Sequence, residues 1–265
     1  MKMHYSSDPV VADGARIERE WRLPGARLVD VSSVVNWFAE GLQIASAKPL
    51  LWLAVILIRA DVATLLAYAR SLSLLAVLVT PFAMAVALLM QERASRGGRW
   101  SVRDVIGAVH AQRNALLTIG LCCVAVTYVG HVISLAAFHV SMTTYVAPNG
   151  VHALTFAYAT HADANNPLEP LVDLLLRVLP VSLMWFAPAL VVLNKASAFD
   201  AMTASVRAVA RNWQVACLYV VVVVSVMLLA SFTPLIVRAL VLTPLASALI
   251  VMSLYGSYRD VFGGR

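Results

Sequence analysis

Residues 48–90 read KPLLWLAVILIRADVATLLAYARSLSLLAVLVTPFAMAVALLM, two long apolar runs joined by the polar step Arg70-Ser71. At a rise of about 1.5 Å per residue, a helix of about 20 residues covers the roughly 30 Å hydrocarbon core of a bilayer. The apolar residues are continuous and do not alternate with polar ones, which favours helices over a membrane β-barrel. The segment therefore predicts a hairpin of two transmembrane helices.

The boundaries of this segment recur along the chain. A basic residue followed by Pro or Asn begins an apolar run at Lys48-Pro49, Arg113-Asn114 and Arg211-Asn212. A proline interrupts the next run at Pro81, Pro188 and Pro244. The first and third spacings between Pro or Asn and the interrupting proline are both 32 positions, and the middle spacing is 74. This internal repeat predicts one unit used three times, with 42 residues inserted in the second copy.

Each unit begins with an amphipathic stretch directly before its first span. Residues 31–42, 102–109 and 199–213 place apolar side chains at helical spacing opposite polar ones. Such helices are expected to lie flat in the headgroup region, with basic ends towards anionic lipid. The alternative is that they are connectors packed on the bundle. The interrupting prolines are expected to shape helix packing, or else to open a central cavity.

We therefore predict an all-α integral membrane protein with six transmembrane helices in three helix-hairpin repeats. The chain is 61% hydrophobic and only 13% charged, whereas a soluble domain carries about 25% charged residues. The predicted spans are 49–69, 71–90, 115–138, 171–193, 213–233 and 235–256. The predicted parts are a polar cytoplasmic tail (1–29), a membrane domain (30–256, with repeat units at about 30–91, 101–193 and 198–256) and a cytoplasmic C-terminal tail (257–265).

The insertion in the second unit, residues 139–170, contains a hairpin signal. Strand-forming residues lie on both sides of Asn149-Gly150, a dipeptide typical of a tight β-turn. We predict a small periplasmic β-hairpin between the third and fourth helices.

The basic residues predict the orientation. Of the 20 Lys and Arg residues, 16 fall in the N-terminal tail, the C-terminal tail or the loops on the same side, and none lies between residues 114 and 176. We predict that the protein lies in the bacterial inner (plasma) membrane. The positive-inside rule then places both termini on the cytoplasmic side. The first apolar run is too long for a cleavable signal peptide. The net charge of +6 is thus a topology signal and predicts no nucleic-acid partner.

Catalytic signatures are absent from the sequence. It contains no Gly-x-Ser-x-Gly elbow, no His-Glu-x-x-His zinc helix and no glycine-rich phosphate loop. We therefore predict that the protein is not an enzyme and has no catalytic, cofactor-binding or metal-binding residues and no cofactor. The three cysteines all fall within predicted spans and are interpreted as small core residues.

Arg59 and Asp61 break the apolar character of the first span. A charge at this depth costs at least about 2.5–3.5 kcal/mol on insertion scales. Two positions apart on a helix, the two side chains point about 200° apart and cannot form an ideal mutual pair. They are candidate functional residues for a polar constriction, a substrate contact or a proton step. The alternatives are a buried ion pair between helices, or a loop that begins earlier than the predicted end of the span.

Other basic side chains at the predicted cytoplasmic face are candidate contacts for lipid headgroups. They are Arg103, Arg113, Arg207, Arg211 and Arg259. Arg259 belongs to the closing sequence, in which Asp260 is expected to pair with a basic residue of an amphipathic helix. That sequence is interpreted as a structural clamp, with a binding site as the alternative.

Three motifs carry a resemblance to a known family: Trp37-Phe-Ala-Glu-Gly41, Trp185-Phe-Ala-Pro-Ala-Leu190 and Tyr255-Gly-Ser-Tyr-Arg-Asp-Val-Phe-Gly263. Over roughly residues 24–263 the chain resembles a family of uncharacterised proteobacterial inner-membrane proteins that end in a Ser-Tyr-Arg-Asp-Ile-Phe-type motif. It is more distantly similar to the membrane domain fused to glycerophosphodiester phosphodiesterases. The charges in the first span and the long insertion depart from the family, and the resemblance implies no catalytic residue.

These observations favour a non-enzymatic membrane protein. It would bind membrane lipids or a protein partner through its cytoplasmic amphipathic helices and its periplasmic hairpin. The alternative is a transporter of a small molecule or lipid, with a polar pathway near Arg59 and Asp61.

Overall fold

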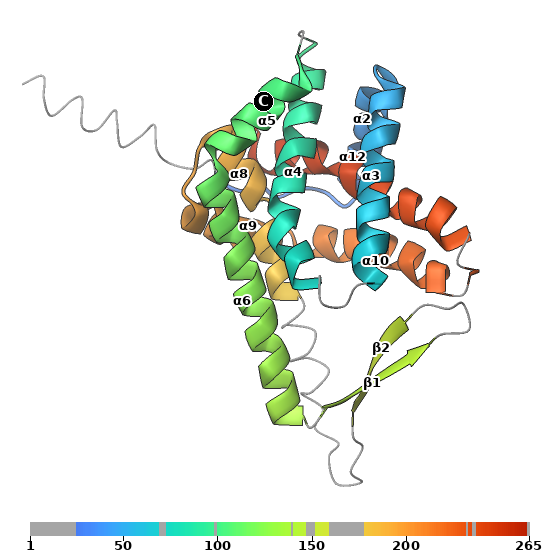
Figure 1. Cartoon of the computed structure of the whole chain (residues 1–265). Coiled ribbons are helices and arrows are strands. Elements are labelled where there is room, and N and C mark those ends of the chain that lie inside the picture. The colour runs from blue at the N-terminus through green and yellow to red at the C-terminus, as the bar shows by residue number, and fades with distance from the viewer. Residues whose placement is uncertain are drawn as a thin grey trace, which may run out of the picture.

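The computed structural model describes residues 25–68, 73–97, 100–138, 140–146, 152–158, 178–231, 233–234 and 237–263. Helices make up most of this part of the chain (Figure 1). At each predicted position a short helix runs directly into a long one. These pairs are α2 (Ser33–Ser46) with α3 (Pro49–Tyr68), α5 (Val102–Ala111) with α6 (Arg113–Phe138), and α9 (Ala198–Arg211) with α10 (Trp213–Ser231). The breaks lie at or beside the three basic residues that the repeat identifies.

A proline-containing helical segment follows each pair. These segments are α4 (Ser73–Ser95), residues 178–185 with α8 (Ala187–Asn194), and the π-helix η2 (Arg238–Leu242) with α12 (Thr243–Phe262). Pro81 and Pro188 are fully buried between helices. Their burial fits the interpretation in which the prolines shape helix packing.

The number of candidate spans is smaller than the predicted six. Three helices are long and apolar enough to cross a membrane alone, over Leu75–Ser95, Arg113–Gly130 and Leu240–Phe262. Two bent pairs would raise the count to five: α2 with the start of α3, at an angle of 120°, and α9 with the start of α10, at 90°. The apolar segment 178–194 is shorter and is broken at Phe186. The described residues therefore support three to five spans.

The break at Phe186 has a local cause. In an unbroken α-helix the Phe186 amide would donate to the carbonyl of Ser182. Instead it donates to the Ser205 hydroxyl of α9 at 2.9 Å, and that hydroxyl donates to the Ser182 carbonyl at 2.6 Å. The hydroxyl is thus inserted into the backbone ladder, just before Pro188, which cannot donate a backbone hydrogen bond. Both backbone groups stay satisfied although the helix ends.

The last helix is longer than the sequence predicts. Residues 257–262, predicted as the start of a cytoplasmic tail, continue α12 to Phe262. The amide of Gly263 then donates to the carbonyl of Arg259 at 2.8 Å and closes the helix. Hydropathy falls after residue 256, but the helix continues because the polar side chains beyond it are held by other helices. The predicted cytoplasmic location of this segment stays a prediction.

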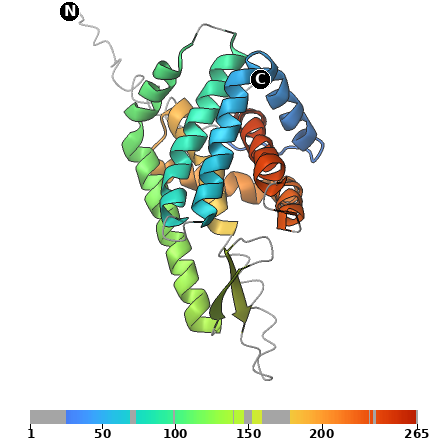
Figure 2. The same cartoon turned by 45° about the vertical axis from the view of Figure 1, so that its right-hand side comes forward.

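Two strands lie within the predicted insertion. β1 (Val140–Val146) and β2 (His152–Tyr158) pair antiparallel, with Val140 opposite Tyr158 and Val146 opposite His152. They lie beside the end of α6 that is farthest from α5 (Figures 1 and 2). Residues 147–151, which include the predicted turn, lie outside the described residues, and the predicted periplasmic location stays a prediction.

The main core lies where α4, α6, α8 and α12 meet. Its fully buried side chains include Met90, Leu116, Ile119, Leu190 and Val251. A smaller cluster around Val34, Trp37 and Tyr219 joins α2 to α10.

α2 crosses α12 at two glycines, with almost no space between the backbones (Figure 2). A Cβ atom at Gly41 would overlap the backbone carbonyl of Met252. A Cβ atom at Gly256 would lie 3.1 Å from the Cα atom of Trp37. Small residues at helix crossings let the backbones approach closely. The α2–α12 crossing therefore requires glycine on both helices.

We expect Gly41→Ala to lower the free energy of unfolding by about 2 kcal/mol, because the added methyl group would press on a backbone carbonyl that cannot rotate away. The measurement is unfolding of the purified protein by titration with a denaturing detergent. Gly107→Ala in α5 is the matched control, since nothing lies within 4 Å of a Cβ atom there. The control should be neutral or stabilising by up to about 1 kcal/mol. Equal losses in the two variants would contradict the tight crossing.

Candidate functional site

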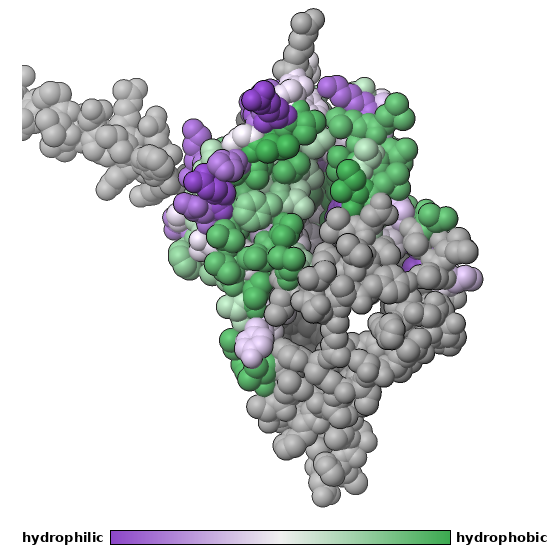
Figure 3. All heavy atoms as spheres, in the orientation of Figure 1, coloured by the Kyte–Doolittle hydropathy of each residue, from purple (hydrophilic) through white to green (hydrophobic). Residues whose placement is uncertain are grey.

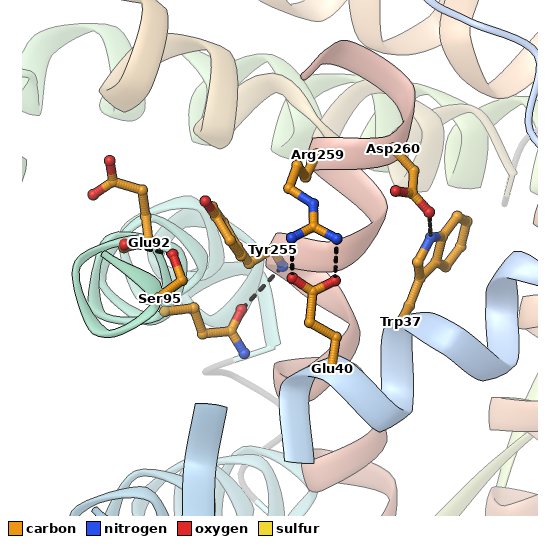
Figure 4. A network of polar contacts seen from close by, with 8 residues as sticks. Trp37, Glu40, Glu92, Ser95, Tyr255, Arg259 and Asp260 are labelled. Atoms are coloured by element: carbon orange, nitrogen blue, oxygen red, sulfur yellow. Dashed lines mark hydrogen bonds and ion pairs between the residues drawn. The ribbon is translucent and has the colours of Figure 1, made fainter. Parts of the chain in front are cut away.

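The end of α12 is clamped to α2 by two polar contacts (Figure 4). The Arg259 guanidinium makes a bidentate ion pair with Glu40, at 2.5 Å from Nη1 to Oε1 and 2.8 Å from Nη2 to Oε2. One residue later, the Asp260 carboxylate accepts a hydrogen bond from the Trp37 indole at 2.7 Å. We call this pair of contacts the clamp.

The clamp corrects one expectation from the sequence. Asp260 was expected to pair with a basic residue of an amphipathic helix, but its partner is Trp37. Successive residues on a helix point about 100° apart, so Arg259 and Asp260 meet different parts of α2. The acidic residue that α2 supplies, Glu40, meets the arginine instead.

α4 and α8 hold the same end of α12. The fully buried Gln91 side chain donates to the Val251 carbonyl at 2.6 Å and accepts from the Tyr255 amide at 3.0 Å. These are two backbone groups that bond each other in a regular α-helix, so the Gln91 amide is inserted between them. The Tyr258 hydroxyl donates to the Asn194 side chain of α8 at 2.5 Å.

The segment before α2 is tied to the same region by Asn212. The Asn212 side chain accepts from the Val29 amide at 2.8 Å and donates to the Arg27 carbonyl at 2.9 Å. The Arg27 amide donates to the Val261 carbonyl at 2.9 Å, and Arg211 donates to the chain at residue 26. Asn212, singled out by the repeat, therefore joins the start of the described chain to the bend between α9 and α10.

Beside the clamp a cavity of about 790 Å³ lies between the ends of α4, α8 and α12. It is lined by three guanidinium groups and one carboxylate, those of Arg93, Arg96, Arg259 and Glu92. Aromatic and apolar side chains complete the wall: Trp100, Tyr255, Tyr258, Leu89, Val192 and Leu193. We call this space the basic cavity.

A second cavity, of about 1120 Å³, lies on the other side of Arg259. Its lining carries both signs of charge, with Arg27 and Arg259 against Asp30, Glu40 and Asp260. A hydrogen bond from the Ser32 hydroxyl lowers the pKa of the exposed Asp30 carboxyl below its usual value. Because the charges nearly balance, this cavity favours no charged ligand.

Arg59, the candidate in the first span, contacts α12. Its guanidinium donates to the Ser247 hydroxyl at 2.9 Å. Nearby along α12, Ser253 shares a hydrogen bond of 2.8 Å with the buried Tyr219 hydroxyl of α10. These bonds place polar groups of α3, α10 and α12 within the bundle. Asp61 lies in α3, but its side chain is outside what the structure describes.

The five predicted lipid contacts divide into two groups. Arg103, Arg113 and Arg207 are exposed, and Arg113 reaches the His110 carbonyl at 3.4 Å. Arg211 and Arg259 are exposed as well, but they bond other parts of the chain. Sequence reasoning did not select Arg93 and Arg96, although three arginines within residues 93–99, directly after an apolar run, were a usable signal.

Each amphipathic helix has two apolar surfaces, one buried and one exposed. In α2, Trp37 is 3% exposed whereas Leu42 is 68% exposed. In α5, Val105 is fully buried whereas its neighbour Ile106 is 56% exposed. In α9, Phe199 is 67% exposed while Ala201 and Met202 are buried. Each helix therefore packs on the bundle, as expected for a connector. Each also presents large apolar side chains outward, as expected for a helix in the headgroup region.

Hydropathy is divided along the molecule. Hydrophilic side chains gather over the end that carries α5, and apolar side chains cover α6 below it (Figure 3).

Within the part of the chain that the structure describes, no three His, Cys, Asp or Glu side chains are grouped to hold a metal ion. Comparisons of the chain with protein-family models, curated proteins and solved structures find no match.

The geometry of the clamp predicts its contribution to stability. In a double-mutant cycle with Glu40→Gln and Arg259→Gln, we expect a coupling energy of about 1 kcal/mol, the upper end for an exposed pair, because the contact is bidentate. Detergent-induced unfolding of the single and double variants measures this coupling. The pair Glu92 and Arg96, four residues apart at the C-terminal end of α4, is the control and should couple by about 0.3–0.5 kcal/mol. A clamp coupling no larger than the control would contradict this assignment.

Proposed function

We propose that the chain is a multi-spanning inner-membrane protein without catalytic activity, whose role is to bind membrane lipid at one end of its helical bundle. The exposed apolar side chains beside the buried faces of α2, α5 and α9 carry this proposal. An apolar residue exposed on one such helix would be unremarkable. The same arrangement on three separate helices supports a common surface in the lipid headgroup region.

We also propose that this end of the bundle faces the cytoplasm and that β1 and β2 face the periplasm. The distribution of basic residues supports this orientation, because loops rich in Lys and Arg stay on the cytoplasmic side. Membership of the resembled inner-membrane family belongs to the same proposal and rests on the three quoted motifs.

Native mass spectrometry of the intact chain tests lipid binding. After extraction in several mild detergents, the protein should retain anionic phospholipid, because basic and apolar groups act together at the headgroup level. Loss of all lipid in every detergent would contradict the proposal.

Spin labels provide a separate positional control. On a cysteine-free background, labels at Leu42, Ile106 and Phe199 should be accessible to oxygen in the bilayer. Labels at Gln43, Arg103 and Arg207, on the same helices, should be accessible to a water-soluble nickel chelate. A reversed or equal pattern would show that lipid binds elsewhere.

A transporter remains the alternative, and the polar contacts among α3, α10 and α12 are the observation that favours it. Under the lipid-binding proposal, Arg59→Leu with Asp61→Leu removes the bond from Arg59 to Ser247. It should leave lipid retention unchanged, because the exposed apolar side chains of α2, α5 and α9 are all kept. Proton and ion flux in proteoliposomes is measured on the same preparations. A flux in the wild-type protein that the double variant abolishes would establish the transporter instead.

A further inference from the structure

We propose that the basic cavity binds the headgroup of an anionic phospholipid, with its phosphate between the guanidinium groups of Arg93, Arg96 and Arg259. This inference rests on the proposed lipid-binding function and gives it a specific site. The cavity volume of about 790 Å³ is in the range of small-molecule sites. Basic cavities between helices on the cytoplasmic side of a membrane suit phosphate headgroups.

The charges around the cavity leave a positive surplus. Arg96 pairs with Glu92, which also lines the cavity, and Arg259 pairs with Glu40, which lines the second cavity. Among the described residues Arg93 forms no ion pair. One guanidinium therefore has no acidic partner, and an anionic ligand would balance it.

The paired arginines also keep donors for a ligand. A guanidinium carries five N–H donors, and a single carboxylate engages only part of them. The side chains of Arg96 and Arg259 remain 76% and 53% exposed. Both can therefore donate to a phosphate oxygen without releasing their glutamates.

Carbonyl groups at the ends of the surrounding helices do not need these donors. The Glu92 carbonyl accepts from the Arg96 amide and from the Ser95 hydroxyl. The Leu190 carbonyl accepts from the Ala196 amide, and the Arg259 carbonyl accepts from the Gly263 amide. Helix C-termini are otherwise a common reason for arginines to gather. Here the chain satisfies these carbonyls with its own backbone and a hydroxyl.

The internal repeat provides an independent observation. Arg96 lies 15 positions after Pro81, and Arg259 lies 15 positions after Pro244. The first and third units therefore place an arginine at the same register, and the packing of α4 against α12 brings both to one cavity. Two guanidiniums facing one space suit the several oxygens of a phosphate.

The rest of the lining favours a lipid over a free phosphate ion. Leu89, Val192 and Leu193 form an apolar wall that a phosphate ion does not need but a glycerol backbone and the start of an acyl chain would contact. Trp100 has the ring type favoured at headgroup depth. The Lys48 ammonium lies 4.5 Å from the centroid of this ring.

The test is binding of phosphatidylglycerol to the full chain, by native mass spectrometry with phosphatidylcholine of the same acyl chains as reference. Arg93→Gln with Arg96→Gln should weaken phosphatidylglycerol binding by about tenfold or more and leave phosphatidylcholine binding unchanged. Arg103→Gln with Arg207→Gln is the control, because it removes two exposed guanidiniums outside the cavity. Ala108→Phe is a second variant, which fills the cavity without changing its charge and should weaken phosphatidylglycerol binding as well.

Each of the other outcomes overturns a defined part of the proposal. Equal weakening by both arginine pairs would assign binding to general surface charge and overturn the cavity. Unchanged binding in the Arg93 and Arg96 variant, with lipid still retained, would overturn the cavity and leave the proposed function standing. A wild-type protein that retains no lipid would overturn both. Inorganic phosphate is the competitor, and its binding through Arg93 and Arg96 without any phosphatidylglycerol preference would overturn the lipid identity.

Discussion

Helices in a bilayer gain little from burying apolar side chains against one another, because the surrounding lipid is as apolar as they are. Close backbone contact and hydrogen bonds must hold them together instead. α12 meets this constraint for five other helices. Gly256 admits α2, and Gln91, Asn194, Tyr219 and Arg59 reach α12 from four further helices. Without these contacts the same apolar residues would fit many arrangements in lipid.

The need for hydrogen bonds between helices explains the polar residues of the closing sequence. Tyr255, Tyr258, Arg259 and Asp260 each contact a different group on α4, α8 or α2. The start of the described chain bonds Val261 as well. The same closing sequence supplies Tyr255, Tyr258 and Arg259 to the wall of the basic cavity. A binding site on a helix end that is fixed from several sides keeps its side chains in place, which favours specific recognition.

The sequence predicted the amphipathic helices well, but it predicted more spans than the described residues support and gave the side-chain contacts poorly. Helical periodicity and the repeat located α2, α5 and α9, because amphipathic spacing depends only on neighbouring residues. The sequence predicted a basic partner for Asp260, whereas the partner is the Trp37 indole. It also gave no sign that the Ser205 hydroxyl is inserted into the backbone hydrogen bonds before α8. Both depend on which helices pack together. Arg93 and Arg96 were not selected for the same reason. They share a cavity with Arg259 only because α12 packs beside the end of α4.

The three copies of the repeat share a geometry but use it for different contacts. Lys48 lies over Trp100, whereas Asn212 binds the segment before α2. The position 15 residues after Pro188 is Thr203, and it lies on α9 because the helix of the second unit ends six residues after its proline. The second unit therefore cannot bring an arginine to the basic cavity. The arginines of the cavity come from the first and third units, whereas the second unit supplies Ala108 of α5 and residues 192–194 of α8 to its wall.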